Sequence, residues 1–314
     1  MMRKLQSDFG NVIFDVYEPE HFNGYVVQIA HGMIEHRKRY VWLCQSLTRE
    51  GFRVYINDHR GHGESIGGPV YLGEMGGDGF EKAMQDMKNL NDLIHEENPN
   101  AKVIMIGHSM GSLLARRYIQ IYAPSIAMLV LTGSPSPVFL ASFGARLCFS
   151  LQKIHLKRDL SALAQQLIFR FSLGKFNRHF RKTKPYSKSH WICSDISVVE
   201  AYDEDRKAHF LFTLNSFGNL FQGLDRVFSD YPKPLPCPRL PILMMSGLED
   251  ACGAFGRGVK KAYNHLRDQG FVDVDLKLYA HCRHEVFNEV GKEKYFADFL
   301  EWFHAHKPKD SQAL

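Results

Sequence analysis

The 314-residue sequence has no long apolar run and no large excess of charge of either sign. No stretch of about 18 apolar residues occurs, which argues against a membrane-spanning helix. The first ten residues carry no apolar segment of the signal-peptide type, so we expect a cytoplasmic protein. The net charge of +5 is modest for this length and argues against nucleic acid as the main partner.

The cysteines are few and widely separated, with no C-x-x-C pair and no spacing typical of a metal site. Scattered thiols fit a reducing compartment better than a disulfide framework. The six positions are Cys44, Cys148, Cys193, Cys237, Cys252 and Cys282.

Apolar, β-branched runs alternate with helical stripes along most of the chain, and a hydrophobic content of 45% supports a sizeable core. This alternation predicts an α/β fold with a mostly parallel sheet covered by helices on both faces. We expect the chemistry at the carboxyl ends of the strands. The expected strands are residues 12–17, 25–30, 52–57, 103–106, 128–132, 242–246 and 274–279.

Residues 136–228 interrupt this alternation, because they show helical stripes and no convincing strand. We interpret them as an inserted helical cap between a first core segment, residues 1–135, and a second, residues 229–314. We expect the aromatic and leucine stripes to form mainly the cap's own core. These stripes comprise Leu160, Leu163, Leu167, Ile168 and Phe171, and then Phe210, Leu214, Phe217, Phe221 and Leu224.

The cap is strongly basic over residues 146–190, which hold eleven Lys and Arg residues and a single acid, Asp159. Two interpretations stay open at this point. The charges either keep a solvated face soluble, or they hold the protein at an anionic membrane surface.

Residues 107–111 read G-x-S-x-G between a buried strand and an amphipathic helix. Gly107 and Gly111 permit a sharp turn that exposes Ser109 at its tip. The helix that follows directs its first N–H groups, including that of Met110, toward any negative charge that develops nearby. Ser109 is therefore the candidate nucleophile.

A serine nucleophile needs a base, and the base needs a carboxylate that orients it. The chain order Ser, acid, His of the α/β-hydrolase fold is met by loops after the last two strands. The first loop offers Glu249 and Asp250, and the second offers His281 and His284. Spacing alone leaves both choices open.

Five segments resemble the monoacylglycerol lipase and bacterial lysophospholipase family of α/β-hydrolases. Residues 246–250 match its S-G-x-x-D and residues 284–289 its H-E-x-x-N-E, so the resemblance selects Asp250 and His284. Residues 31–36, with a nearby R-Y, match H-G-x-x-E-H, from which we expect the Met33 and Met110 amides to form the oxyanion hole. Residues 58–65 match D-x-R-G-H-G-x-S, and residues 191–195 are similar to W-L-S-R-D.

The resemblance implies a serine hydrolase that cleaves carboxylic esters of single-chain lipids, with the cap lining the substrate pocket and no metal or organic cofactor. A carboxylesterase or thioesterase for small acyl substrates, a prolyl-type aminopeptidase, and a non-catalytic binding protein on the same scaffold are the alternatives. These motifs leave the acyl chain, the head group and the oligomeric state open.

Overall fold

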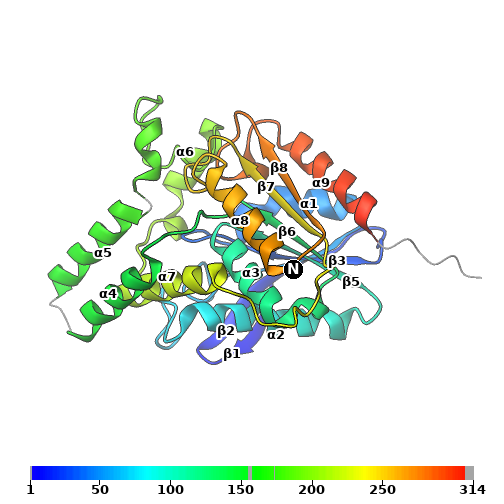
Figure 1. The fold of residues 1–314 in the computed structure, drawn as a ribbon, viewed down its shortest axis with the longest axis horizontal. Helices are drawn as coiled ribbons and strands as arrows, with labels where there is room; N and C mark the ends of the chain where they lie inside the picture. Colours follow the sequence, from blue (N-terminus) through cyan, green and yellow to red (C-terminus); the bar gives the residue numbers. More distant parts are fainter. Residues whose placement is uncertain (1, 155–157, 173, 308–314) are drawn as a thin grey trace, which may run out of the picture.

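The computed structural model describes residues 2–154, 158–172 and 174–307, and the strands form a single eight-stranded sheet (Figure 1). Its order is β1-β2-β4-β3-β5-β6-β7-β8. All neighbouring strands from β4 to β8 pair in parallel, whereas the β1–β2 and β2–β4 pairs are antiparallel. The predicted mostly parallel sheet is therefore confirmed. The strands are β1 (Met2–Ser7), β2 (Gly10–Tyr17), β3 (Tyr25–Ala30), β4 (Arg53–Asn57), β5 (Lys102–His108), β6 (Met128–Thr132), β7 (Ile242–Gly247) and β8 (Val274–Tyr279).

Strand β1 is the one strand that the sequence pattern does not indicate. It lies at the edge of the sheet, pairs only with β2, and alternates between exposed and half-buried residues. Because an edge strand covers little of the core, it needs no apolar run, and apolar periodicity therefore fails to detect it.

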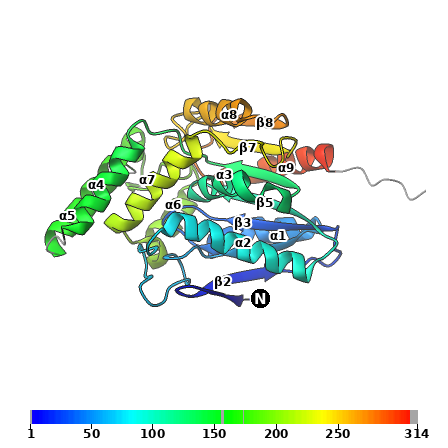
Figure 2. The ribbon, with the colours of Figure 1, turned by 60° about the horizontal axis from the view of Figure 1, so that its bottom comes forward.

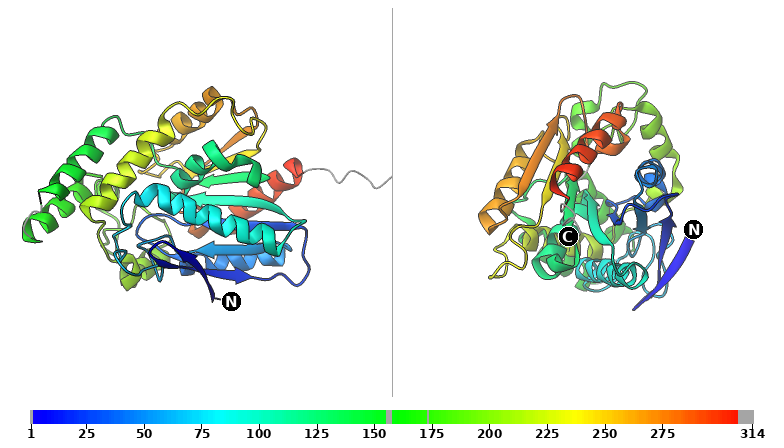
Figure 3. Two further views of the ribbon diagram at one scale, coloured as in Figure 1. Left: turned by 90° about the horizontal axis from the view of Figure 1, so that it is seen from below. Right: turned by 90° about the vertical axis from the view of Figure 1, so that its right-hand side faces the viewer.

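Helices cover both faces of the sheet, as predicted (Figure 3). The apolar cluster on one face includes residues of α2 (Gly79–Glu97), α3 (Met110–Tyr122) and α8 (Arg257–Gln269). The cluster on the other face includes residues of α1 (Val41–Arg49) and α9 (Lys292–His306). Strand β5 is buried on both sides, since Val103 and Met105 belong to the first cluster, whereas Ile104 and Ile106 belong to the second.

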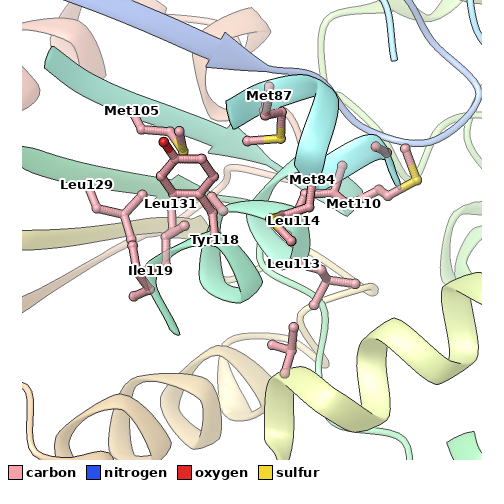
Figure 4. Packing of buried hydrophobic residues seen from close by; sticks show 14 of the residues in the cluster. Met84, Met87, Met105, Met110, Leu113, Leu114, Tyr118, Ile119, Leu129 and Leu131 are labelled. Carbon is pink, nitrogen blue, oxygen red and sulfur yellow. The ribbon is translucent and has the colours of Figure 1, made fainter. Parts of the chain in front are cut away.

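Helix α3 is packed firmly on the first face of the sheet. Figure 4 shows its residues Tyr118 and Ile119 beside Met105 of β5 and Leu129 and Leu131 of β6. All five side chains are fully buried. Because α3 begins directly after Ser109, this packing fixes the position of the candidate nucleophile.

Within the described residues, the chain between β6 and β7 forms helices and no strand. These are α4 (Ala141–Lys153), α5 (Arg158–Ser172), α6 (Ile196–Glu204) and α7 (Leu214–Phe228). Figure 2 shows α4 and α5 at one end of the molecule, with α7 between α4 and the core. The helical cap is thus present, and its limits at residues 136 and 228 remain our interpretation of the sequence.

The expectation that both cap stripes are buried is wrong for α5. Leu160, Leu163, Leu167 and Phe171 are all exposed, whereas Leu214, Phe217 and Leu224 of α7 are buried. Helix α7 packs against α2, α3 and α4, but α5 packs chiefly against α7. Periodicity identifies an apolar face of a helix but does not say whether another element covers it.

Among the described helices, none combines the length and the apolarity that crossing a bilayer requires.

Candidate active site

Ser109 lies at the turn that joins β5 to α3, with φ +51° and ψ −115°. Such a conformation is strained for a residue other than glycine, and strain of this kind is typical of a nucleophile at a strand-to-helix turn. The flanking glycines are required by contact: a Cβ on Gly107 would lie 2.6 Å from Gly111 O, and one on Gly111 would lie 2.1 Å from Ala30 O. The turn leaves the Ser109 side chain half-exposed.

Asp250 and His284 form a buried hydrogen-bonded pair on the loops after β7 and β8. His284 Nδ1 donates to Asp250 Oδ1 at 3.1 Å, and the two residues are 2% and 0% exposed, respectively. Asp250 Oδ1 also accepts from the Cys252 amide at 2.8 Å, and Ser246 Oγ donates to its Oδ2 at 3.3 Å. With Nδ1 bound to the carboxylate, the Nε2 atom of His284 is left to accept a proton.

The His284 loop meets the nucleophile turn through His108. The ring centroids of His108 and His284 lie 4.7 Å apart. A Cβ on Gly133, which follows β6, would lie 2.8 Å from His108 Cε1 and 3.0 Å from His284 Cε1, so only glycine fits there. No hydrogen bond joins Ser109 Oγ to His284 in the described residues; catalytic hydrogen bonds often tighten only when substrate is bound.

Charge and burial oppose each other at the acid–base pair. Burial by itself would lower the pKa of His284, but the charge and hydrogen bond of Asp250, together with the charges of Glu285 and Glu35, outweigh burial and raise that pKa. Burial would likewise raise the pKa of Asp250, yet the imidazole and backbone N–H groups lower it. The pair therefore favours an ionised Asp250 beside a readily protonated His284.

The alternative candidates, Glu249 and His281, lie at the surface. His281 Nδ1 is 3.3 Å from Glu249 Oε1, but the side chains are 93% and 41% exposed. Water screens such a pair, which makes it a weak means of orienting a base. Burial and hydrogen bonding both favour Asp250 and His284.

The segment after β3 approaches the nucleophile turn, as the expected oxyanion hole requires. A Cβ on Gly32 would lie only 3.1 Å from Ser109 Cβ. Within the described residues, the backbone amides of Met33 and Met110 donate no hydrogen bond to the protein. Both amides are therefore available to an oxyanion, and Met110 also stands at the first position of α3.

A buried ionic network links the segment after β3 to the His284 loop. The motifs alone do not reveal its role. Arg39 Nη1 donates to Glu35 at 2.8 Å, and its two Nη atoms donate to both oxygens of Glu285 at 2.7 and 2.8 Å. Glu35 in turn accepts from the Gly32 amide and from Tyr40 Oη. Burial would lower the pKa of Arg39, but the two carboxylates raise it, so the guanidinium stays charged.

Three neutral histidines brace the same segment. His31 Nδ1 donates to Gly32 O at 2.7 Å, and His31 Nε2 accepts from the His59 amide at 2.9 Å. Burial lowers the pKa of His31 well below its ordinary value, that of His59 to about 3 and that of His62 to about 4. Because these three side chains are buried and neutral, they are suited to supporting the shape of the loops and not to proton transfer.

Two groups of side chains in the described residues could ligate a metal. In the first, Asp250, Cys252 and His284 hold ligand atoms within 4.8 Å of one another. Burial raises the pKa of the Cys252 thiol well above its ordinary value, so it stays protonated and is a poor ligand. The second group lies at the amino end of β8 and the end of α9, whereas Ser109 follows the carboxyl end of β5; it comprises Asp273, Asp275 and His306.

A protein-family model described as Hydrolase_4, serine aminopeptidase S33, matches residues 23–291. The match spans the nucleophile turn and both loops of the acid–base pair. The chain belongs to this family. Among its relatives, the monoacylglycerol lipase of Mycolicibacterium smegmatis is 25% identical over 308 residues, covering 94% of this chain and 93% of the relative. The rat monoglyceride lipase is 24% identical over 270 residues, covering 84% and 77%.

The closely similar fold of a solved esterase agrees with this assignment. A thermostable carboxyl esterase of Bacillus coagulans, solved in complex with glycerol, is 26% identical with a TM-score of 0.83. The superposition covers 97% of each chain. The family confirms the α/β-hydrolase fold that the motifs predict.

Proposed function

We propose that this protein hydrolyses carboxylic esters of single-chain lipids, with Ser109, His284 and Asp250 as its catalytic triad. The protein is a serine hydrolase of the lipase and esterase type, as its relatives are. Two of these relatives are named for monoacylglycerols or monoglycerides, and the Bacillus coagulans esterase was solved with glycerol, the alcohol that such substrates release. The buried Asp250–His284 pair beside the Ser109 turn is the observation that carries the proposal.

In the first half of the reaction, Ser109 Oγ attacks the acyl carbon while His284 Nε2 takes the hydroxyl proton. The Met33 and Met110 amides stabilise the negative carbonyl oxygen. His284 then gives its proton to the leaving alcohol as the ester C–O bond breaks. In the second half, His284 deprotonates a water that attacks the acyl-enzyme, and the fatty acid leaves. Asp250 stabilises the imidazolium in both halves.

An aminopeptidase on this scaffold would need a free carboxylate for the substrate's ammonium group. Two buried glutamates whose charges act on His284, Glu35 and Glu285, are both bound by Arg39. Both carboxylates are thus already engaged in a buried ion pair and are not free to bind an ammonium group, which favours an uncharged ester as the substrate. The lipase names of the relatives point the same way.

Two measurements test the proposal. A fluorophosphonate probe should label Ser109 in the wild-type protein, because the probe reacts only with an activated serine. Hydrolysis of p-nitrophenyl esters, monoacylglycerols, lysophospholipids and a prolyl p-nitroanilide should then be compared. We expect turnover of the single-chain lipid esters. An unlabelled Ser109, or turnover of the anilide alone, would contradict the proposal.

The pH dependence follows from the raised pKa of His284. Because the base must be neutral to accept the Ser109 proton, kcat/KM should rise with pH and reach half its plateau above pH 6.5, the ordinary value for histidine. Asp250→Asn removes the charge that raises this pKa, so the acid limb should move to lower pH as the plateau falls. A pH–rate series on a short soluble ester measures both the position of the acid limb and the height of the plateau. An acid limb below pH 6.5 in the wild type would contradict a raised pKa.

We further propose that the cap holds the enzyme at an anionic membrane surface. Large apolar side chains are exposed along the start of the cap and along α4 and α5, and Phe139 is fully exposed. Exposed basic side chains lie on the same helices and on the segment that follows them. The exposed apolar residues are Val138, Phe139, Leu140, Phe143, Leu147, Ile154, Leu160, Leu163, Leu167 and Phe171.

Sedimentation with vesicles tests this docking. Binding should rise with anionic lipid and fall with salt. Each basic side chain near such a surface adds about 1 kcal/mol at low salt, so removing four should weaken binding by roughly two to three orders of magnitude. The variant replaces Arg178, Arg181, Lys182 and Lys184 with glutamine.

A matched control removes four exposed charges from α8 and α9, away from the cap, and should leave vesicle binding nearly unchanged. Its positions are Lys260, Lys261, Arg267 and Lys294. Phe139→Ser should weaken binding at high and low salt alike, because apolar burial is not screened. All variants should keep their activity on a short soluble ester. If the wild type ignores anionic vesicles at low salt, membrane docking is wrong.

A further inference from the structure

A tryptophan of the cap lies against the imidazole of the candidate base. The ring centroids of Trp191 and His284 are 4.9 Å apart, and the planes are inclined by 42°. The distance is within the range over which an aromatic ring attracts a cation. Among the described residues, Trp191 and His108 are the two rings in contact with His284.

Hydrogen bonds on both sides of Trp191 attach this part of the cap to the His284 loop. Arg283 Nη1 donates to the carbonyl of His190 at 2.7 Å. The Glu285 amide donates to the carbonyl of Ile192 at 2.8 Å. The residues before and after Trp191 are thus bonded to the residues before and after His284. The contact between the two rings is therefore held by one side-chain and one backbone hydrogen bond, and does not depend on the two rings alone.

Neighbouring contacts fix the orientation of the indole. The Trp191 amide donates to Asn177 Oδ1 at 3.1 Å. The ring of Phe176 packs on the indole with centroids 5.2 Å apart. Farther along the same segment, Ser194 donates from its amide to Glu289 Oε1 at 2.9 Å. Trp191 is therefore supported from the cap side by Phe176 and from the core side by the His284 loop.

We propose that Trp191 is a positioning residue for the reaction, whose indole holds the His284 ring in place and stabilises its imidazolium form. This inference rests on the proposed triad, in which His284 becomes positively charged in each half of the reaction. The negative face of the indole attracts that charge, and half-burial strengthens the attraction relative to water. Asp250 binds the Nδ1 edge of the imidazole, so an aromatic contact adds stabilisation without competing for a hydrogen bond.

A simple packing role for Trp191 makes the opposite prediction. If the indole only excluded water, its removal would hydrate His284, favour the charged form and raise the pKa of the imidazole. If the indole attracts the imidazolium, its removal lowers that pKa. The direction of the change therefore separates the two roles.

The experiment titrates His284 by NMR of histidine-labelled protein in the Ser109→Ala background, where turnover does not interfere. Trp191→Leu keeps an apolar side chain but loses the ring, and should lower the pKa of His284 by about one unit. Trp191→Phe keeps a ring that attracts a cation more weakly than indole does, so its His284 pKa should lie between those of the wild-type residue and Trp191→Leu. In the active enzyme, Trp191→Leu should lower kcat for a short soluble ester roughly tenfold, with little change in KM.

Phe176→Leu is the matched control, since it removes a cap ring that contacts Trp191 but not His284. It should leave the pKa of His284 nearly unchanged. Circular dichroism and thermal melting establish that each variant folds. An unchanged or raised pKa in both Trp191 variants would overturn the inference, whatever the loss of kcat. Failure of the triad itself is distinguishable, because it would appear as an unlabelled Ser109 in the wild-type protein.

Discussion

Replacing Ser109 or His284 with alanine should lower kcat for ester hydrolysis by about four to six orders of magnitude. The first change removes the atom that attacks the acyl carbon, and the second removes its base. Asp250→Asn should be milder than either, at roughly two to four orders, because the imidazole remains and loses only its orientation and its charge partner. Burst and steady-state kinetics on a p-nitrophenyl ester measure the loss of kcat in all three variants.

Glu249→Gln is the matched control for Asp250→Asn, because it neutralises the adjacent carboxylate. Glu249 is half-exposed and pairs with the exposed His281, so its loss should leave kcat within a few fold of the wild type. Thermal unfolding should show that every variant keeps its fold. If Glu249→Gln lost most of its kcat while Asp250→Asn kept nearly all of it, our choice of Asp250 as the catalytic acid would be wrong.

Met33→Pro should nearly abolish activity, whereas Met33→Ala should keep much of it. Proline lacks the N–H that we expect to bind the oxyanion, and the loss of one such donor costs about 10²- to 10³-fold in kcat. Alanine keeps the amide and removes only a half-buried side chain. The comparison therefore isolates the backbone donor from the packing of the methionine.

The rate of fluorophosphonate labelling provides a second measurement of the oxyanion hole, because the probe also forms a negatively charged oxygen at Ser109. Labelling should slow in Met33→Pro and stay near the wild-type rate in Met33→Ala. Thermal melting would reveal any misfolding caused by the proline. Equal losses in both variants would point to a role for the Met33 side chain instead of its amide.

The six internal strands could be predicted from the sequence because each carries apolar residues whose burial follows from its own composition, and the edge strand β8 could be predicted because apolar and polar residues alternate along it. The edge strand β1 and the exposed stripe of α5 could not. In both cases the deciding factor is which surface a neighbour covers, and apolar periodicity contains no information about neighbours. The same limitation separates the buried stripe of α7 from the exposed stripe of α5.

The sequence by itself determined the nucleophile turn, because the sterics of a strand, two glycines and a helix act over a few adjacent residues. It also determined the order of the nucleophile, acid and histidine loops, although spacing left two acids and two histidines open and a family resemblance was needed to choose. Only the tertiary structure decided which pair is buried, since Asp250 and His284 lie 34 residues apart. It likewise decided the contact of Arg39 with Glu285, across 246 residues, and that of Trp191 with His284. Burial and long-range pairing depend on how loops meet at the carboxyl edge of the sheet, and no local pattern specifies that meeting.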